Sequence, residues 1–343
     1  MLKKIIRKLF LYAGPWSLLR TIERKKNGPG ITILYGHRVM TDDIMSNPND
    51  PRFITGHTSV SQVAEAIKEL KKYYQIISMD EAVSQISKGE IKQESVVLTF
   101  DDGFRDNFIN LLPVLKEHNV PATFYVNASV IDSKRNLWFQ AVINFFFAIE
   151  ENQVYVALNN HQYDLSTPGK RYQAAFHFMQ FIQSEKKPEE FYPLIEALAG
   201  DKCLPCDEDI HMTWNDLRIL IDEPLITLGA HSLRHFPLSY CEPQLAESEI
   251  IESISQLEEN LGITINHFSY PRGHQKDFNA HHISVLQAKN IKSATTTLRG
   301  VNRRGQDLYS LKRVGFPQNI SNDVDEFLWY VGGIPQLLEK LRA

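Results

Sequence analysis

The stretch Val96-Val97-Leu98-Thr99-Phe100-Asp101-Asp102-Gly103-Phe104-Arg105 joins an apolar run to two adjacent carboxylates. The run has the length and composition of a buried strand, and Asp-Gly is a common turn dipeptide. Side chains alternate between the two faces of a strand, so both acids can reach one site only if the chain turns sharply, which we expect at Gly103. The stretch predicts a strand that either delivers two acids to a cavity or ends in a solvated turn.

The composition is that of an ordinary globular protein. The chain has 343 residues, of which 43% are hydrophobic and 23% charged, enough for one large barrel or two modest domains. The formal net charge is −4, which argues against a nucleic-acid partner because such proteins carry a surplus of Lys and Arg.

The cysteines do not indicate a disulfide framework. There are three of them, Cys203, Cys206 and Cys241, and this small odd number favours a reducing compartment. Cys203 and Cys206 have the spacing of a redox or half-zinc site, but neither a second pair nor a strand–helix context accompanies them. We therefore expect no redox or zinc function from this pair.

Strand and helix patterns alternate along much of the chain. Apolar strand segments are expected at 31–35, 74–78, 96–100, 122–126 and 225–229, with helical periodicity between them from residue 59, over 79–88, over 107–118 and from residue 214. This alternation predicts a parallel sheet or barrel, in which chemistry sits at the carboxyl ends of the strands. His37 and the pair Asp101–Asp102 both follow such ends.

Residues 131–213 interrupt the alternation and are interpreted as a mainly helical insertion. A helix is expected over 137–150, a hairpin over 154–165 and helical structure over 172–199. The first helix is rich in aromatic residues, namely Trp138, Phe139, Phe145, Phe146 and Phe147. These rings could line a sugar site, although aromatic stripes on helices more often belong to a core.

The N-terminal segment, residues 1–29, is expected to contain a basic amphipathic helix. Its apolar run from Leu9 to Leu19 is interrupted by Gly14-Pro15 and is too short to span a bilayer. No small-residue cleavage pattern follows it. The helix of residues 1–20 either lies on an anionic membrane surface or docks on the protein. We expect a cytoplasmic protein, with the first alternative adding peripheral contact with the inner face of the cell membrane.

Two histidines follow another expected strand end. His231 and His235 are four residues apart, a spacing that within a helical turn places both imidazoles on one face and suits one metal ion. One carboxylate and two imidazoles leave coordination positions for water and substrate, as in catalytic zinc-type sites. A second carboxylate beside them would remain available as a base.

Three motifs in this order resemble those of the polysaccharide deacetylases, which form carbohydrate esterase family 4 and share the NodB-homology domain. They are Thr99-Phe-Asp-Asp-Gly103, His231-Ser-Leu-Arg-His235 and Phe268-Ser-Tyr-Pro-Arg-Gly273. The segment Leu34-Tyr-Gly-His-Arg-Val39 resembles an early element, and Ala294-Thr-Thr-Thr297 a late strand, of the deacetylases found in surface-polysaccharide loci. The resemblance covers roughly residues 30–130 and 214–320.

The resemblance implies a distorted (β/α) barrel over residues 30–343, interrupted by the insertion 131–213. It implies that Asp102, His231 and His235 hold a divalent metal ion, most simply zinc, and that Asp101 is the general base. After Pro271, the backbone N–H of Arg272 would stabilise the oxyanion. The implied reaction removes an N-acetyl group from an amino sugar of a polymeric or lipid-linked precursor in surface-polysaccharide biosynthesis.

The sequence departs from the family pattern in two places. Many members carry an arginine that orients the base where this chain has Ser269, and Arg313, at another expected strand start, could replace it. Many members also end with a histidine that acts as the general acid, but no histidine follows His282. His37 is the first candidate for that role, and His274 and His267 are the alternatives.

The sequence also allows two other functions. The same barrel can hydrolyse other amides or acetyl esters, and a barrel without its late histidine could bind glycans without turning them over. The presence of Asp101 beside Asp102 argues against the second alternative, because a protein that only binds needs no base.

Overall fold

The structure is a computed structural model. It describes residues 24–25, 27–47, 50, 52, 58–133, 135–199, 210–316 and 324–333. The expected helix of residues 1–20 lies outside these ranges, as do Cys203 and Cys206. Within the described residues, no helix combines the length and apolar character needed to cross a membrane.

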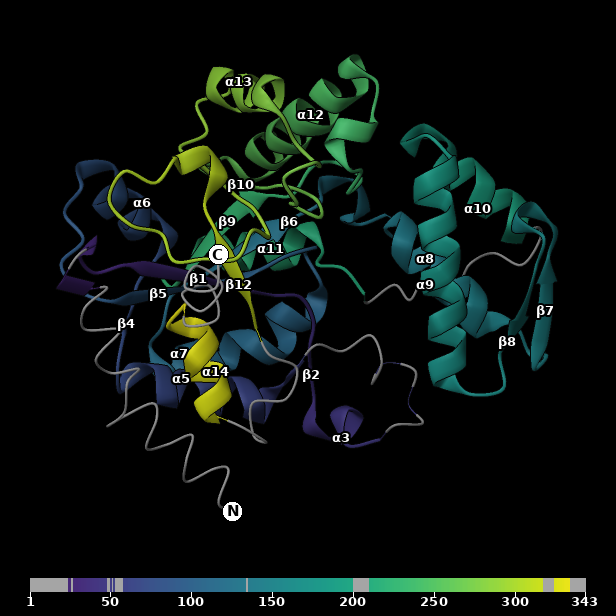
Figure 1. The fold of residues 1–343 in the computed structure, drawn as a ribbon, viewed down its shortest axis with the longest axis horizontal. Coiled ribbons are helices and arrows are strands. Elements are labelled where there is room, and N and C mark those ends of the chain that lie inside the picture. The colour runs from purple at the N-terminus through teal and green to yellow at the C-terminus, as the bar shows by residue number, and fades with distance from the viewer. Residues whose placement is uncertain are drawn as a thin grey trace.

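Seven of the described strands form a nearly closed parallel barrel (Figure 1), which confirms the expected (β/α) fold. Their hydrogen-bonded order is β11-β10-β9-β6-β5-β1-β12, and a parallel bridge between Thr295 and Leu311 brings the two edges together. The barrel strands are β1 (Ile31–Gly36), β5 (Ser95–Phe100), β6 (Ala122–Val126), β9 (Ile226–Ala230), β10 (His267–Ser269), β11 (Ser293–Thr295) and β12 (Arg313–Gly315).

Five further strands accompany the barrel. Strand β4 (Gln75–Ile76) pairs with the first half of β5. The other four form two separate pairs, β2 (Val39–Met40) with β3 (Thr58–Ser59) and β7 (Gln153–Val156) with β8 (His161–Asp164).

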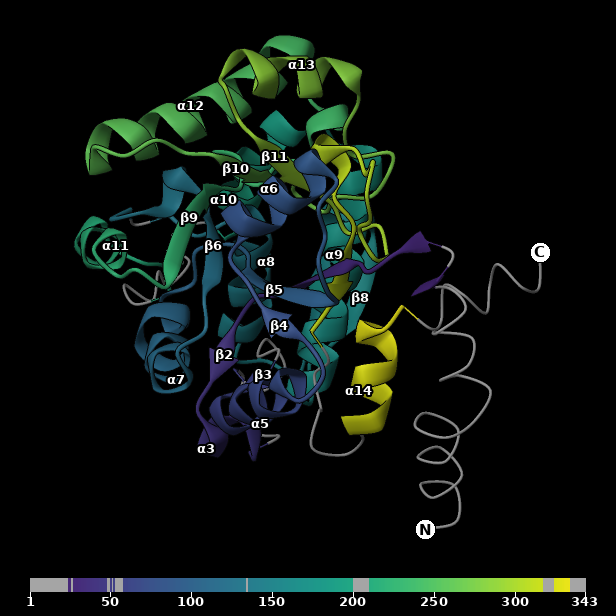
Figure 2. The ribbon, with the colours of Figure 1, turned by 90° about the vertical axis from the view of Figure 1, so that its left-hand side faces the viewer.

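Helices surround the barrel on its outer side (Figures 1 and 2). Buried apolar side chains of α5, α7, α12 and α13 join those of the strands in the largest hydrophobic cluster. The helices outside the insertion are α3 (Asp42–Met45), α5 (Val60–Lys71), α6 (Met79–Lys88), α7 (Leu112–His118), α11 (Trp214–Ile221), α12 (Pro243–Leu261), α13 (Ala280–Ala288) and α14 (Val324–Val331).

Local sequence signals account for several helix boundaries. Helix α6 has the predicted bounds, because Ser78 caps its first turn through the N–H of Glu81 and Gly89 ends it at φ 68°. The helix expected over 107–118 is instead a π-helix, Asn107–Leu111, followed by α7. Pro113 has no N–H to donate within the ladder, which explains the change of helix type before it.

The segment from α8 to α10, residues 138–199, forms what we call the inserted unit, and it stands beside the barrel in Figure 1. It consists of α8 (Trp138–Ala148), the hairpin β7–β8, α9 (Pro168–Glu185) and α10 (Phe191–Ala199). Its buried side chains form a hydrophobic cluster separate from that of the barrel. Trp138 and Phe146 are buried in this cluster, and Phe139, Phe145 and Phe147 pack against it, as the core interpretation of these aromatics predicts.

Candidate metal centre and active site

The end of β5 places both carboxylates in the interior of the barrel. All six residues of β5 are buried, and Asp101 continues the pairing with β1 through its N–H to the Gly36 carbonyl at 3.0 Å. The turn begins one residue earlier than expected, because Asp102 as well as Gly103 has a positive φ, 74° and 66°. Few non-glycine residues adopt such a conformation, and those that do often lie at functional sites. Both acids remain buried.

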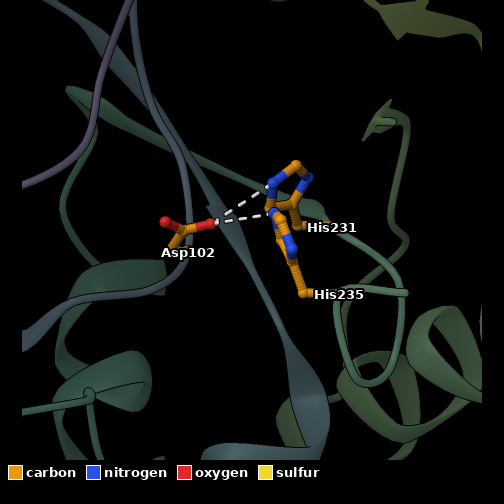
Figure 3. A group of neighbouring side chains, drawn as sticks. All are labelled: Asp102, His231 and His235. Atoms are coloured by element: carbon orange, nitrogen blue, oxygen red, sulfur yellow. Dashed lines mark ion pairs between the residues drawn. The ribbon is translucent and has the colours of Figure 1, made fainter. Parts of the chain in front are cut away.

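Asp102, His231 and His235 meet at one point, as Figure 3 shows. Oδ1 of Asp102 lies 3.4 Å from Nε2 of His231 and 3.4 Å from Nε2 of His235. Ligand atoms about 2.0–2.1 Å from a tetrahedral zinc ion are about 3.3 Å apart, so the two spacings from Asp102 match one ion, and all three ligand atoms lie within 4.8 Å of one another. Oδ1 of Asp102 is buried without a hydrogen-bond partner among the described residues, as expected of an atom suited to a cation.

His231 lies at the carboxyl end of β9. Its N–H donates to the Val126 carbonyl of β6 at 3.0 Å, and its Nδ1 lies 2.7 Å from the Ser269 carbonyl of β10. The second contact requires a proton on Nδ1, which leaves the lone pair of Nε2 directed at Asp102.

The prediction of a helical turn between His231 and His235 is wrong. The two residues are joined by an irregular loop in which Ser232 and His235 have φ values of 62° and 59°. The Ser232 hydroxyl accepts a hydrogen bond from the His235 N–H at 3.0 Å. This local turn, rather than helical periodicity, brings the second imidazole next to the first.

Asp102 and His235 have the protonation states that suit a cation site, whereas at His231 burial is outweighed by the neighbouring carboxylates of Asp101 and Asp102, which raise the pKa of the imidazole. Burial favours the neutral form of Asp102, but the neighbouring imidazoles of His231 and His235 hold the pKa of its carboxyl well below the usual range. Burial lowers the pKa of His235 to about 4, so that this imidazole is neutral at neutral pH. An anionic carboxylate and a neutral imidazole are the protonation states that metal binding requires.

Asp101 lies outside this cluster and is paired with Arg313. The guanidinium donates to both carboxylate oxygens, Nη1 to Oδ1 at 2.8 Å and Nη2 to Oδ2 at 2.7 Å. Burial alone would raise the pKa of Asp101, but Arg313 and His231 hold it below its usual value. Ser269, at the position where an arginine was expected, reaches Asp101 only at 3.5 Å. The structure thus pairs Asp101 with Arg313, the residue that the sequence offered in place of the missing arginine.

The turn after β10 carries the residues expected to stabilise an oxyanion. Pro271 is buried, and Arg272 and Gly273 have positive φ values of 60° and 65°. A Cβ at Gly273 would lie 2.8 Å from the backbone N of Thr297, so only glycine fits this close approach. The Arg272 side chain contacts Gln183 and Tyr240.

The three histidines considered as general acid lie in different places. His37 follows β1 and is half-buried, with its ring 5.9 Å from that of Tyr35. After the larger effects of burial and of the two imidazoles, His37 also lowers the pKa of Asp102, so it lies within electrostatic range of the centre. His274 is exposed. His267 begins β10, at the opposite end of that strand from Ser269, and contacts Asp80 and Ser293.

One histidine near the site was not predicted from the sequence. His211 is buried, and its ring stacks on Phe104 with 5.2 Å between centroids. Residues 104 and 211 also form an antiparallel bridge directly after the acidic pair. Burial lowers the pKa of His211 to about 4, against the influence of the nearby Asp102. A single bridge between distant loops leaves no local pattern in the sequence, so nothing there could have revealed this contact.

The remaining cysteine carries no sign of reactivity. Cys241 is a half-buried free thiol, and burial raises its pKa to about 12. Such a thiol is protonated at neutral pH and is a poor nucleophile.

Comparison with known proteins identifies the family. Residues 88–294 match the family model described as polysaccharide deacetylase. No curated protein sequence matches the chain. Solved structures share the fold at low sequence identity, including a deacetylase from Streptococcus pyogenes in complex with acetate, with a TM-score of 0.56 at 17% identity over 88% of this chain and 97% of the other.

Two further structures are similar over comparable lengths. IcaB from Ammonifex degensii has a TM-score of 0.55 at 16% identity over 88% of this chain and 97% of its own. A de-N-acetylase from Aggregatibacter actinomycetemcomitans has a TM-score of 0.52 at 14% identity over 87% and 99%. The family model spans well over half of the chain and includes Asp101, Asp102, His231, His235 and the turn at Pro271. The chain therefore belongs to the polysaccharide deacetylase family, which indicates a carbohydrate N-deacetylase.

Proposed function

We propose that this protein is a metal-dependent hydrolase that removes the N-acetyl group from an amino sugar of a polysaccharide or lipid-linked precursor. The observation that carries the proposal is that two adjacent carboxylates have different partners. Asp102 faces His231 and His235, whereas Asp101 is paired with Arg313. One acid is placed to hold an ion, and the other is kept outside the ligand set and ionised.

Asp102, His231 and His235 would hold a divalent ion, most simply zinc. Such an ion supplies Lewis acidity, which makes water a nucleophile at neutral pH and polarises an acetyl carbonyl. Two imidazoles and one carboxylate also suit other divalent ions, so the donor set alone does not choose among them.

The other residues then account for the movement of protons and charge. Asp101 accepts the proton of the attacking water at a carboxylate oxygen, and Arg313 keeps that carboxylate oriented and anionic. The Arg272 backbone N–H donates to the oxyanion that forms from the acetyl carbonyl. His37 donates a proton to the departing sugar amine, so that acetate and a free amine leave the site.

The proposed substrate class rests on the element Leu34–Val39, which resembles deacetylases of surface-polysaccharide loci. A lipid-linked precursor at the inner face of the cell membrane would suit a basic helix in residues 1–20, because such helices bind anionic lipid surfaces. Deleting residues 1–20 should then abolish co-sedimentation with anionic liposomes, and unchanged binding would remove the membrane part of the proposal.

The test of the function is acetate release from a panel of N-acetylated oligosaccharides, lipid-linked amino sugars and acetyl esters. We expect the metal-loaded wild type to release acetate from an N-acetylated sugar and the Asp101→Asn variant to release almost none. Reaction with soluble oligosaccharides alone would refute the lipid-linked substrate. Cleavage of esters alone, or binding of glycans without any acetate release, would refute the N-deacetylase.

A further inference from the structure

The two imidazoles of the candidate metal centre are supported in different ways. His231 has a carbonyl partner for Nδ1 at 2.7 Å, the kind of contact that usually fixes the ring of a metal-binding histidine. Nδ1 of His235 is buried with no hydrogen-bond partner among the residues that the structure describes. His235 also sits in a loop at a φ of 59°. Its position must therefore depend on contacts other than the usual one.

Those contacts come from Trp138 and Phe139, the first two residues of α8 in the inserted unit. The indole Nε1–H of Trp138 donates to the carbonyl oxygen of His235 at 3.1 Å. The ring of Phe139 meets the His235 ring nearly edge-on, with 5.0 Å between centroids and 66° between planes. The first contact fixes the peptide of His235, and the second restricts the orientation of its imidazole.

Trp138 is in turn held by the core of the inserted unit. Its side chain is 2% exposed, and its ring lies 4.8 Å from that of Phe191 in α10. The direction of the indole N–H is therefore set by the packing of α8 against α10. The same unit reaches the oxyanion turn, where Gln183 of α9 accepts a hydrogen bond from Arg272 at 3.1 Å.

We propose that Trp138 and Phe139 are positioning residues that hold His235 as a metal ligand, so that the inserted unit sets the metal affinity of the barrel. This inference rests on the proposed function, because it requires His235 to bind the ion. It gives the inserted unit a role in the site although none of its side chains belongs to the proposed ligand set.

The experiment measures the dissociation constant of zinc by competition with a chromophoric chelator, and the absorption spectrum of the cobalt-substituted protein. Trp138→Phe removes the N–H and keeps a ring, and Phe139→Leu removes the ring. Phe139→Tyr keeps the ring at the same position. Phe178→Leu disturbs the same core, where the Phe178 ring contacts Phe146 and Phe181 instead of His235.

Changes next to a metal ligand typically weaken binding about 10- to 100-fold, and we expect that range for Trp138→Phe and Phe139→Leu. Their cobalt spectra should also change, because the geometry around His235 is altered. Phe139→Tyr and Phe178→Leu should bind zinc within about twofold of the wild type, since effects at separate sites are independent.

Wild-type zinc affinity in both Trp138→Phe and Phe139→Leu would overturn the inference. Equal weakening in Phe178→Leu would overturn it too, because the effect would then reflect the general stability of the inserted unit. A wild-type protein that binds neither zinc nor cobalt would refute the metal centre and with it the proposed function. That result is distinguishable from wild-type binding that the variants leave unchanged.

Discussion

The barrel and the inserted unit differ in how they serve the site. The barrel supplies the candidate reactive groups from its strands and the turns that follow them, with Asp101 and Asp102 after β5, His231 after β9 and Arg313 at the start of β12. The inserted unit has a core of its own and contributes contacts instead, through Trp138 to the His235 loop and through Gln183 to Arg272.

This difference indicates that the reactive groups and the contacts that hold the loops in place come from different parts of the chain. Parallel strands bring their carboxyl ends to one edge, so residues far apart in sequence converge there without special local structure. The inserted unit can then adjust the loops without carrying reactive groups. If this division is correct, substitutions of the reactive groups in the barrel should abolish turnover, whereas substitutions in the core of the inserted unit that do not contact the His235 loop should change stability alone.

Apart from the two carboxylates themselves, the largest effect is expected for Arg313→Met, which removes the charge and keeps a long side chain. Asp101 would be left buried without its partner, so the free energy of unfolding should fall by about 3–5 kcal/mol. Acetate release should fall about 10³-fold, because the general base loses its orientation. Denaturant unfolding and an acetate assay measure the two effects.

The matched control is Arg218→Met, which alters an exposed arginine on α11 and should change neither quantity. Retention of full activity by Arg313→Met would mean that the barrel does not position its base through this ion pair.

A smaller loss is expected for His37→Gln, which removes the proposed proton donor at the end of β1. General acids typically contribute about 10²- to 10⁴-fold, and we expect a loss near the lower limit, since water can replace a half-buried donor. Metal content should not change. The same substitution at the exposed His274 serves as the control. Full activity in His37→Gln together with a loss in His274→Gln would show that His37 is not the general acid.

The smallest effect is expected for Phe178→Leu in the inserted unit. Phe178 is fully buried in α9, and this change of shape within the core should lower the free energy of unfolding by about 1 kcal/mol. The rate of acetate release should stay close to that of the wild type. A loss of turnover as large as that of His37→Gln would show that the division between barrel and inserted unit is wrong.

Much of the barrel could be predicted because its signals are local. Strand β6 and helix α6 have the predicted bounds, and the strand before Asp101 is fully buried as expected. The convergence of the three motifs followed from their position at strand ends. The proposal that Arg313 replaces the missing arginine followed from the family pattern, and the structure places it against Asp101 at 2.7 and 2.8 Å.

The parts that could not be predicted depend on contacts between distant segments. The loop of His235 takes its shape from the positive φ values of Ser232 and His235, and no glycine in the loop indicates them in the sequence. Phe139 resembles any other aromatic residue of a core helix, yet its ring meets His235. His211 reaches the site through one bridge between loops. In each case tertiary packing determines the position of the side chain, and the local sequence pattern does not predict it.

The central claim is that two adjacent carboxylates have separate roles, and the most direct test compares Asp101→Asn with Asp102→Asn. Metal content and acetate release are measured on both variants and the wild type. We predict that Asp101→Asn keeps the full metal content of the wild type and releases no acetate, whereas Asp102→Asn loses both. Loss of the metal from Asp101→Asn, or its full retention by Asp102→Asn, would contradict the account.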